Sequence, residues 1–455
     1  MSSVSRLSTV EVMKVARARF IQFSSQKYAD DSIPNHVLGC VPLGLSDQDA
    51  KEVELAHLLL AFADKVGKQQ YDQARKLQNL CHFLSSNTGN TVQKVVYYFS
   101  KALQERTDRE TGRITYKSSE SKDLLAMHLE KTMACCPAFF ACFLELPFYQ
   151  VTQFAGIQAI VESVASAKRV HFIDLEIRSG GHCTVLMQAL ASRYEQPIEM
   201  LKVTAVGNGT SSRQKLEDTG KRLAQFAEAL HLPFTFKIAM VTNINDINED
   251  AFESEDGEAT AVYCSLMRSS MISLPDCLET AITALRKLNP CLMVITETEA
   301  NLYSPVFEDR FNEALFYYGA YYDCLDVCMD SCSPYRRELE ETFLAQQIKN
   351  IIASEEERIF RHMRIDVWRS LFAKFGMVEA ELSLSSLYQA DLTAKQFACG
   401  KSCTLNMNGK CLTVGWKGTP ILSLSAWKFH AVNTKTSKYL IYSWHVHLSD
   451  VLHYL

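Results

Sequence analysis

The sequence has no large excess of charge of either sign. Its 47 Lys and Arg residues stand against 52 Asp and Glu residues, which leaves a net charge of −5. This balance excludes bulk electrostatic attraction as the basis of nucleic-acid binding. Basic residues occur in pairs such as Lys168-Arg169 and Arg336-Arg337, without a zinc-finger or basic-zipper pattern. Sequence-specific DNA binding is therefore not expected. The alternative is DNA binding in a groove lined by arginines from distant segments.

Long apolar runs and paired cysteines are also missing. No stretch of about 18 apolar residues occurs, so no transmembrane helix is predicted. The N-terminal segment MSSVSRLSTVEVMKVARARF lacks the apolar region of a secretory signal. The 15 cysteines are odd in number and scattered, which predicts reduced thiols in the cytosol or nucleus.

The short motifs of common enzymes are absent too. There is no glycine-rich phosphate loop ending in Lys-Ser/Thr and no G-x-S-x-G nucleophile turn. Cys399, Cys403 and Cys411 are close in sequence, but they lack the paired spacing and in-register histidines of a zinc site. We therefore expect no metal there, and we expect Cys135-Cys136 to be buried thiols.

What the sequence does contain is an alternation of strands and helices. Apolar runs of strand length are separated by helical patterns, which predicts a parallel sheet with right-handed crossovers. The fold class is therefore α/β with a Rossmann-like core. The predicted strands span residues 170–175, 201–206, 234–241, 261–265 and 291–297.

Helical segments precede this core and short strands follow it. Residues 51–165 carry apolar side chains at helical spacing, which predicts an N-terminal α-helical cap on a core of residues 166–430. Antiparallel strands are predicted near its end, and Asn408-Gly409 is the strongest hairpin signal. Residues 1–50 are a weakly patterned leader that we expect to be mobile, and 431–455 form an atypical tail.

The turn after the first predicted strand decides whether a cofactor binds. A cofactor-binding turn needs an acid and then glycines at alternate positions, because only glycine allows a close approach of the backbone. Here Asp174 is followed at those positions by Glu176, Arg178 and Gly180. We therefore predict no cofactor and no catalytic residue, and we expect Asp174 to accept hydrogen bonds from its own loop or the next helix. The crevice candidates are Asp174, Glu176, Gly180, Gly181 and, after the second strand, Asn208.

One helical segment matches a form that docks into apolar grooves. Residues 55–59 fit L-x-x-L-L, a pattern typical of short helices that bind partner proteins. Amphipathic core helices produce the same pattern, so packing within the cap is the alternative. The candidate partner-binding residues are Leu55, Leu58, Leu59, Phe62 and Val66.

Several ordered motifs resemble those of the plant GRAS-domain family, which includes the DELLA and SCARECROW-like regulators. The resemblance covers about residues 53–429, and residues 55–106 are similar to the family's first leucine-rich region. Trp368 has the family's W-x7-G spacing to Gly376, and Trp416 and Trp427 have its W-x10-W spacing. The VHIID motif corresponds to Val170, His171, Phe172, Ile173 and Asp174, and the SAW motif to Ser425, Ala426 and Trp427.

The resemblance implies a methyltransferase-similar core without catalysis, in a GRAS domain that spans residues 51–430. It also implies a transcriptional regulator in development or hormone signalling, located in the nucleus with the cytoplasm as a second site. Its expected partners are transcription factors and other GRAS proteins in homo- or heterodimers, with DNA contacted indirectly and no membrane. A methyltransferase-like protein that binds S-adenosylmethionine or another small molecule is the alternative. Residues 1–50 lack an acidic DELLA segment, so direct hormone-receptor control is not expected.

Overall fold

The protein forms two compact units in a computed structural model. The residues described are 6–25, 45–113, 137–208, 210–241, 249–265, 275–355, 358 and 362–430, so the tail and Cys135-Cys136 lie outside them. Unit 1 comprises residues 1–146, 300–361 and 416–421, and unit 2 comprises 147–299, 362–415 and 422–455. This division differs from the predicted boundary near residue 165. None of the helices in the described ranges is long and apolar enough to cross a membrane.

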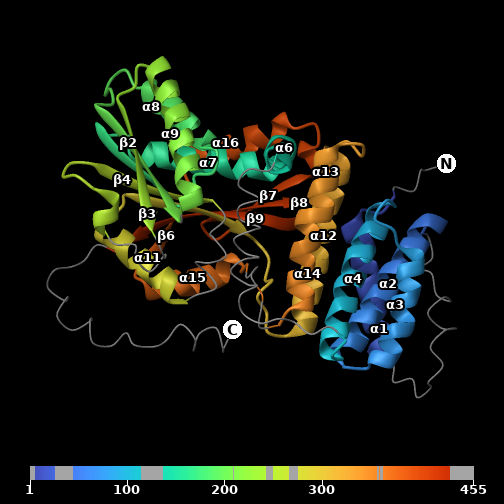
Figure 1. The fold of residues 1–455 in the computed structure, drawn as a ribbon. Coiled ribbons are helices and arrows are strands. Elements are labelled where there is room, and N and C mark those ends of the chain that lie inside the picture. The colour runs from blue at the N-terminus through green and yellow to red at the C-terminus, as the bar shows by residue number, and fades with distance from the viewer. Residues whose placement is uncertain are drawn as a thin grey trace. The chain divides into compact units, whose positions relative to one another are not determined.

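The described elements of unit 1 are mainly helical. Polar residues start two of its helices: the Ser46 side chain accepts a hydrogen bond from the Asp49 N–H, and Asn90 forms a capping box with Gln93. Figure 1 shows the helices of unit 1. They are α1 (Thr9–Ser25), α2 (Asp47–Gly67), α3 (Tyr71–Leu84), α4 (Thr91–Glu110), α6 (Pro137–Glu145), α12 (Phe307–Cys328), α13 (Pro334–Glu338), the π-helix η3 (Leu339–Leu344) and α14 (Ala345–Ala353).

Aromatic side chains join segments of unit 1 that are far apart in sequence. Phe99 of α4 packs edge-on against Phe311 of α12, with ring centroids 5.6 Å apart. Tyr98 stacks on Tyr322 at 5.8 Å. Such pairs add to the free energy gained from burying apolar area. The predicted cap is thus completed by helices that follow the fifth predicted strand.

Helix α1 corrects the prediction of a mobile leader. It packs against α2 and α12, and the backbone N–H of Thr9 donates to Asp323 Oδ1 at 3.3 Å. The apolar stripe is short and is interrupted by basic residues, so its helical period is weak in the sequence. The buried apolar side chains of α1 are Val10, Val12, Met13 and Ala16.

Helix α2 decides between the two interpretations of the L-x-x-L-L segment. Its apolar face packs against α1, α3, α4 and α12, and burial of that face is favourable because it removes apolar area from water. These side chains therefore belong to the core of unit 1, and they do not form an exposed partner-binding face. The buried residues are Leu55, Leu58, Leu59, Phe62 and Val66.

Unit 2 contains a sheet whose parallel half, as predicted, is built from strands separated by helices, in the strand order of a doubly wound fold. The strand order is β3-β2-β1-β4-β5-β9-β8-β7, with β6 paired to β9. Strands β1 to β5 are parallel, and β9 is antiparallel to β5. The strands are β1 (Arg169–Asp174), β2 (Met200–Asn208), β3 (Phe234–Val241), β4 (Ala259–Ser265), β5 (Leu292–Thr298), β6 (Met377–Ala380), β7 (Cys403–Asn408), β8 (Cys411–Trp416) and β9 (Thr419–Phe429).

The turn between β7 and β8 confirms the predicted hairpin. Gly409 adopts φ 59°, a left-handed conformation that glycine tolerates without a steric penalty. β8 is buried along its whole length, and the hairpin extends the antiparallel half of the same sheet beyond β9. The expected α/β fold with C-terminal antiparallel strands is confirmed.

Helices cover both faces of the sheet in unit 2. Figure 1 shows α7, α8 and α16 on one side and α11 and α15 on the other. Helix α16 was not predicted, because its large apolar residues Leu384 and Tyr388 point outward and break the expected pattern. The helices are α7 (Pro147–Ser163), α8 (Gly181–Ala191), α9 (Thr210–Ala229), α11 (Pro275–Lys287), α15 (Ile365–Lys374) and α16 (Leu384–Gln396).

Candidate functional site

The carboxyl end of β1 is the candidate site of the α/β core. β1 lies between β2 and β4, and the chain returns from β3 to β4 across it. In open α/β sheets, ligands bind outside the carboxyl ends of the strands at this kind of switch point. Asp174 ends β1 there, and it is fully buried.

Both carboxylate oxygens of Asp174 are already hydrogen-bonded. Oδ1 accepts the backbone N–H of Glu176 at 2.9 Å, and Oδ2 is bonded to Nε2 of His182. The prediction that Asp174 accepts hydrogen bonds from its own loop is confirmed. The bond to His182 adds a charged partner in the first turn of α8.

His182 is held by ring contacts as well as by the carboxylate. Its imidazole stacks on Tyr263 of β4, with centroids 4.8 Å apart and planes 24° from parallel. Burial alone disfavours the imidazolium, but negative charge on the Cys183 sulfur, once that thiol is ionised, and on the Asp174 carboxylate outweighs burial and raises the pKa of His182 to about 10. At neutral pH, therefore, a buried ion pair joins β1 to α8.

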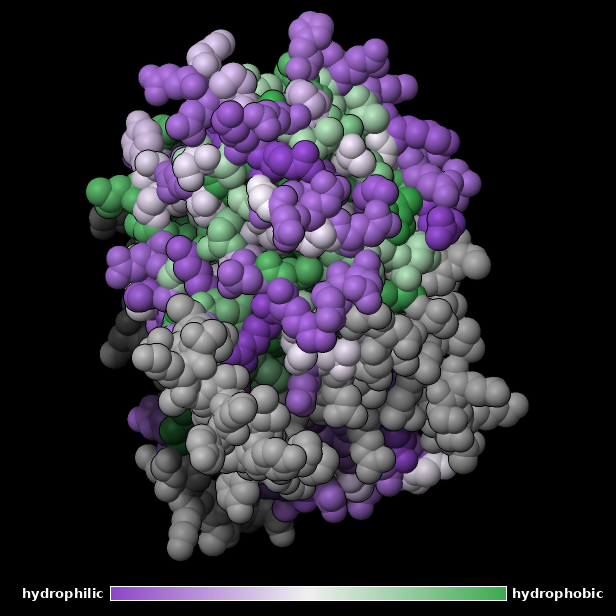
Figure 2. Space-filling model, turned by 90° about the vertical axis from the view of Figure 1, so that its left-hand side faces the viewer, coloured by the Kyte–Doolittle hydropathy of each residue, from purple (hydrophilic) through white to green (hydrophobic). Residues whose placement is uncertain are grey.

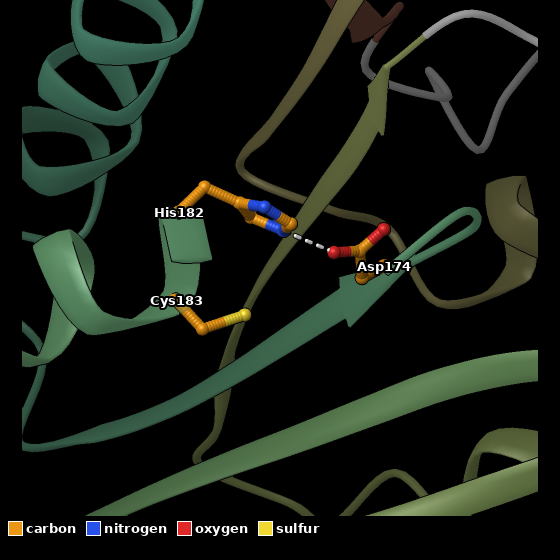
Figure 3. Close-up of side chains that lie close together, drawn as sticks. All are labelled: Asp174, His182 and Cys183. Atoms are coloured by element: carbon orange, nitrogen blue, oxygen red, sulfur yellow. Dashed lines mark hydrogen bonds and ion pairs between the residues drawn. The ribbon is translucent and has the colours of Figure 1, made fainter. Parts of the chain in front are cut away.

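Cys183 completes a compact group of three donors. Figure 3 shows the His182 ring and the Cys183 sulfur extending from α8 toward the Asp174 carboxylate. Their possible ligand atoms all lie within 4.8 Å of one another, and all three residues are buried. Burial raises the pKa of the Cys183 thiol, so it is protonated at neutral pH and is a poor nucleophile.

The glycines of the turn serve helix packing. Gly180 has φ +72° and caps α8, and a Cβ atom there would lie 3.0 Å from Thr219 Cγ2 and 3.2 Å from Leu223 Cδ1 of α9. Gly181 begins α8 and is exposed. Gly180 therefore brings the turn close to α9, and the same contact leaves no room there for a ligand.

The charged residues of the turn lie near the same edge. Glu176 and Arg178 are partly exposed, and Arg178 has φ 48°, a left-handed conformation that is uncommon for a residue with a side chain. Asn208 is at the end of β2, where its backbone is paired with Val241, and its side chain lies outside the described atoms. The five crevice candidates thus share one sheet edge, where the Asp174 carboxylate bonds both to its own turn and to α8.

The rest of the first strand motif is structural. Val170, Phe172 and Ile173 are buried, and Nε2 of His171 lies 2.8 Å from the Thr204 hydroxyl. Burial and the nearby Lys202 lower the pKa of His171 to about 4, although Glu258 opposes this shift. His171 is therefore a neutral core histidine, as its place in an apolar strand predicts.

Comparison with known proteins identifies the family. The sequence profile of the GRAS domain family matches residues 55–428. This chain belongs to the GRAS domain family. It is 31% identical over 392 residues to "DELLA protein GAI1" of Vitis vinifera, which covers 85% of this chain and 64% of that protein. It is 30% identical over 397 residues to "DELLA protein 2" of Medicago truncatula, with coverages of 86% and 70%.

A solved structure shows the same fold as this GRAS protein. The crystal structure of SCL7 from Oryza sativa superposes with a TM-score of 0.72 at 23% sequence identity, over 82% of this chain and 99% of that chain. The GRAS protein spans 64% of the length of the grapevine relative. The resemblance predicted from the VHIID-like and SAW motifs is confirmed at the level of the family and fold.

The tryptophan motifs of the GRAS protein are parts of the core. Trp427 packs edge-on against Phe372, with centroids 4.8 Å apart, and its indole N–H donates to the Ser425 hydroxyl at 2.8 Å. Ala426 is buried beside them on β9, and Trp368 is buried on α15. Within unit 1, the indole N–H of Trp416 donates to Asp323 at 2.6 Å. Both tryptophans of the W-x10-W spacing, Trp416 and Trp427, are therefore buried and hydrogen-bonded through their indole N–H groups.

Sequence reasoning missed His182, Cys183 and Tyr263. Within the described residues, the single group of three His, Cys, Asp or Glu donors close enough to share an ion is Asp174, His182 and Cys183. The available signal was a His-Cys pair in the first turn of the helix that follows an acid-ended strand. The group does not include Cys399, Cys403 and Cys411, which lie close together in the sequence.

Proposed function

We propose that this GRAS protein is a plant transcriptional regulator that acts in the nucleus through protein partners and has no enzymatic activity. One observation carries the proposal: the acid at the switch point of the sheet is bonded to its own turn and to His182. A cofactor that binds there needs those oxygens or a close backbone approach. The family membership supports the same function, because its curated relatives here are DELLA proteins.

The alternative is a methyltransferase-like protein that binds S-adenosylmethionine. Glu176 and Arg178 occupy turn positions where glycine would allow close approach, and Gly180 is packed on α9. Titration calorimetry with S-adenosylmethionine tests this alternative on the full chain. We expect no binding at millimolar cofactor, and a micromolar Kd that Asp174→Asn abolishes would establish the alternative instead.

Exposed apolar residues at the end of α3 support partner binding in unit 1. Phe83 is 85% exposed, and Leu80 and Leu84 are largely exposed beside it. Burial of these side chains against another protein would be favourable, because each now keeps apolar area in water. We propose this α3 end, in place of the buried face of α2, as the first surface for transcription factors or other GRAS proteins.

By contrast, the described face of unit 2 that Figure 2 presents is mainly hydrophilic, with apolar residues scattered among polar ones. Scattered apolar residues are normal on soluble proteins and need no partner. On α16, Tyr388 is 63% exposed and offers a matched control surface in unit 2.

The experiment is affinity purification of the tagged full chain from plant nuclei, with partners identified by mass spectrometry. We expect a DNA-binding transcription factor among the enriched proteins. The variant Phe83→Asp should lose it, and the control Tyr388→Asp should keep it. The proposal would be contradicted if the protein were excluded from nuclei. It would also be contradicted if the same transcription factors were enriched equally by Phe83→Asp, by Tyr388→Asp and by the tag alone.

Binding to DNA is tested separately with the purified chain. Because the net charge is −5 and basic residues are dispersed, we expect weak binding that falls steeply with salt and shows no sequence preference. Gel shifts across a salt series measure this. Tight binding to one DNA sequence at physiological salt would show that the protein recognises DNA directly, and it would contradict the proposal of indirect contact.

A further inference from the structure

The group Asp174, His182 and Cys183 has the geometry of an ion-binding site. The carboxylate belongs to the last residue of β1, and the imidazole and thiol belong to the first turn of α8. One donor atom from each residue lies within 4.8 Å of the other two. Figure 3 shows the ring and the sulfur directed toward the same carboxylate. The three donors thus surround a common point between a strand and a helix.

These distances suit a small transition-metal ion. Zinc binds sulfur at about 2.3 Å, imidazole nitrogen at about 2.0–2.1 Å and carboxylate oxygen at about 2.0–2.2 Å. Two donors on one tetrahedral ion are then roughly 3.3–3.8 Å apart. An ion placed among the three donors therefore requires the hydrogen-bonded atoms of Asp174 and His182 to separate by about 1 Å, and donors as far apart as 4.8 Å to approach by about as much.

The donor types restrict the ion further. A thiolate and an imidazole favour zinc and its neighbours, whereas magnesium and calcium prefer oxygen donors alone. With Asp174 and Cys183 both ionised, the charges of a divalent ion and its ligands cancel. This matters because Asp174 is 0% and Cys183 0% exposed, and an unbalanced charge at such depth is strongly disfavoured.

We propose that Asp174, His182 and Cys183 bind one divalent transition-metal ion of the zinc type, which joins the carboxyl end of β1 to the first turn of α8. The ion replaces the hydrogen bond between Asp174 and His182, and the protons of Cys183 Sγ and His182 Nε2 leave to solvent. The site is structural, because its buried sulfur and carboxylate are closed to a substrate.

This ion would fix the turn that carries Gly180. The turn connects β1 to α8 through only six residues, and its ends would be tied by three coordinate bonds. A bound ion stabilises the folded state because the unfolded chain does not hold the ligands together. The inference concerns the same sheet edge as the proposed function, but metal content and partner binding are separate measurements.

Cobalt substitution of the full chain tests the site. The protein is expressed in minimal medium with cobalt, and its metal content and absorption spectrum are measured. We expect about one ion per chain and a near-ultraviolet band from charge transfer between sulfur and cobalt, because soft thiolates bind such ions. X-ray absorption of the same sample should show a single sulfur with nitrogen and oxygen neighbours. The absence of cobalt, or two or more sulfurs around it, would overturn the proposal.

Matched serine variants assign the sulfur. Cys183→Ser should reduce the bound metal at least tenfold and remove the charge-transfer band. The control Cys142→Ser changes another buried thiol, in unit 1, and should keep both. Equal metal content and equal bands in the two variants would refute the site. If Cys183→Ser does not fold, Asp174→Asn replaces it, with at least a tenfold weaker metal affinity expected.

Discussion

Two buried histidines of unit 2 differ in protonation state. His171 lies inside β1, where burial and the nearby Lys202 ammonium lower its pKa to about 4, although the Glu258 carboxylate lies 3.6 Å from its Nδ1. His182 lies beyond the end of the same strand against the Asp174 carboxylate, and its pKa is raised to about 10. Burial acts in the same direction on both. Negative charge in direct contact outweighs burial at His182, whereas burial and the Lys202 ammonium outweigh the Glu258 carboxylate at His171, so one histidine packs as an ion and the other as a neutral ring.

The variants below are measured on the metal-free protein, in which His182 is charged, and the largest expected effect comes from removing the partner of this histidine. Asp174→Ala leaves the His182 imidazolium buried without its carboxylate, and breaking a buried pair in this way costs about 3–5 kcal/mol. Chemical denaturation at pH 7 measures the loss of unfolding free energy. The variant Asp174→Asn keeps an acceptor for Glu176 N–H and should lose less. A loss below about 1 kcal/mol for Asp174→Ala would contradict the ion pair.

The two histidines predict opposite responses to pH. Folded His182 keeps its proton up to about 10, whereas the unfolded residue releases it near 6.5. Its contribution is therefore complete below pH 6.5 and falls as pH rises, by up to about 1.4 kcal/mol per pH unit. Folded His171 binds a proton only near 4, so its contribution falls as pH decreases from 6.5 toward 4.

Unfolding free energies measured across pH on two variants separate the alkaline limb, which is the loss of stability above pH 6.5, from the acidic limb, which is the loss below it. His182→Gln should flatten the change of stability between about pH 6.5 and 7.5, below the range in which unfolded cysteines titrate. His171→Gln should flatten the acidic limb and leave the alkaline limb as in the wild type. If unfolding free energy changed with pH in the same way in both variants, the two histidines would not differ in protonation state.

A smaller effect is expected at the neutral histidine. Thr204→Val keeps the shape of the β2 side chain but removes the hydroxyl 2.8 Å from His171 Nε2. One buried ring nitrogen then lacks a partner, which costs about 2 kcal/mol. Denaturation at pH 7 checks this value against that of Asp174→Ala. Equal losses of unfolding free energy for Thr204→Val and Asp174→Ala would show that charge adds no stability to the pair of Asp174 and His182.

The smallest effect concerns the turn that positions His182. Gly180→Ala puts a side chain at φ +72° and within 3.0 Å of Thr219 Cγ2, so we expect a loss of about 1 kcal/mol. Gly181→Ala is the matched control, because its Cβ atom would meet only Ser179 Oγ at 3.8 Å. Thermal unfolding should show a lower Tm for the first variant and an equal or higher Tm for the second. A reversed order would mean that the turn differs in solution.

Local sequence features predicted much of the core. The apolar run before Asp174 indicates β1, and Asn408-Gly409 indicates the hairpin, because both signals lie within a few residues. The hydrogen bond from Glu176 N–H to Asp174 was predictable for the same reason. Features of this kind need no knowledge of tertiary packing.

Contacts that depend on tertiary packing were not predictable in this way. The pair of Asp174 and His182 requires the turn to bring two residues eight positions apart into contact, and the stacking on Tyr263 requires β4 beside β1. The leucines of α2 carried a partner-binding pattern, yet the surrounding helices bury them. Helices α1 and α16 were missed because their apolar stripes are short or face outward.

The place of β9 in the sheet has a consequence for synthesis on the ribosome. β9 pairs with the outer edge of β5, yet its residues follow β5 by more than a hundred positions in the chain. A nascent chain that ends at residue 298 has all five parallel strands but leaves the hydrogen-bonding groups of β5 open to other strands. We therefore expect this GRAS protein to need protection from aggregation during translation until residues 419–429 have emerged.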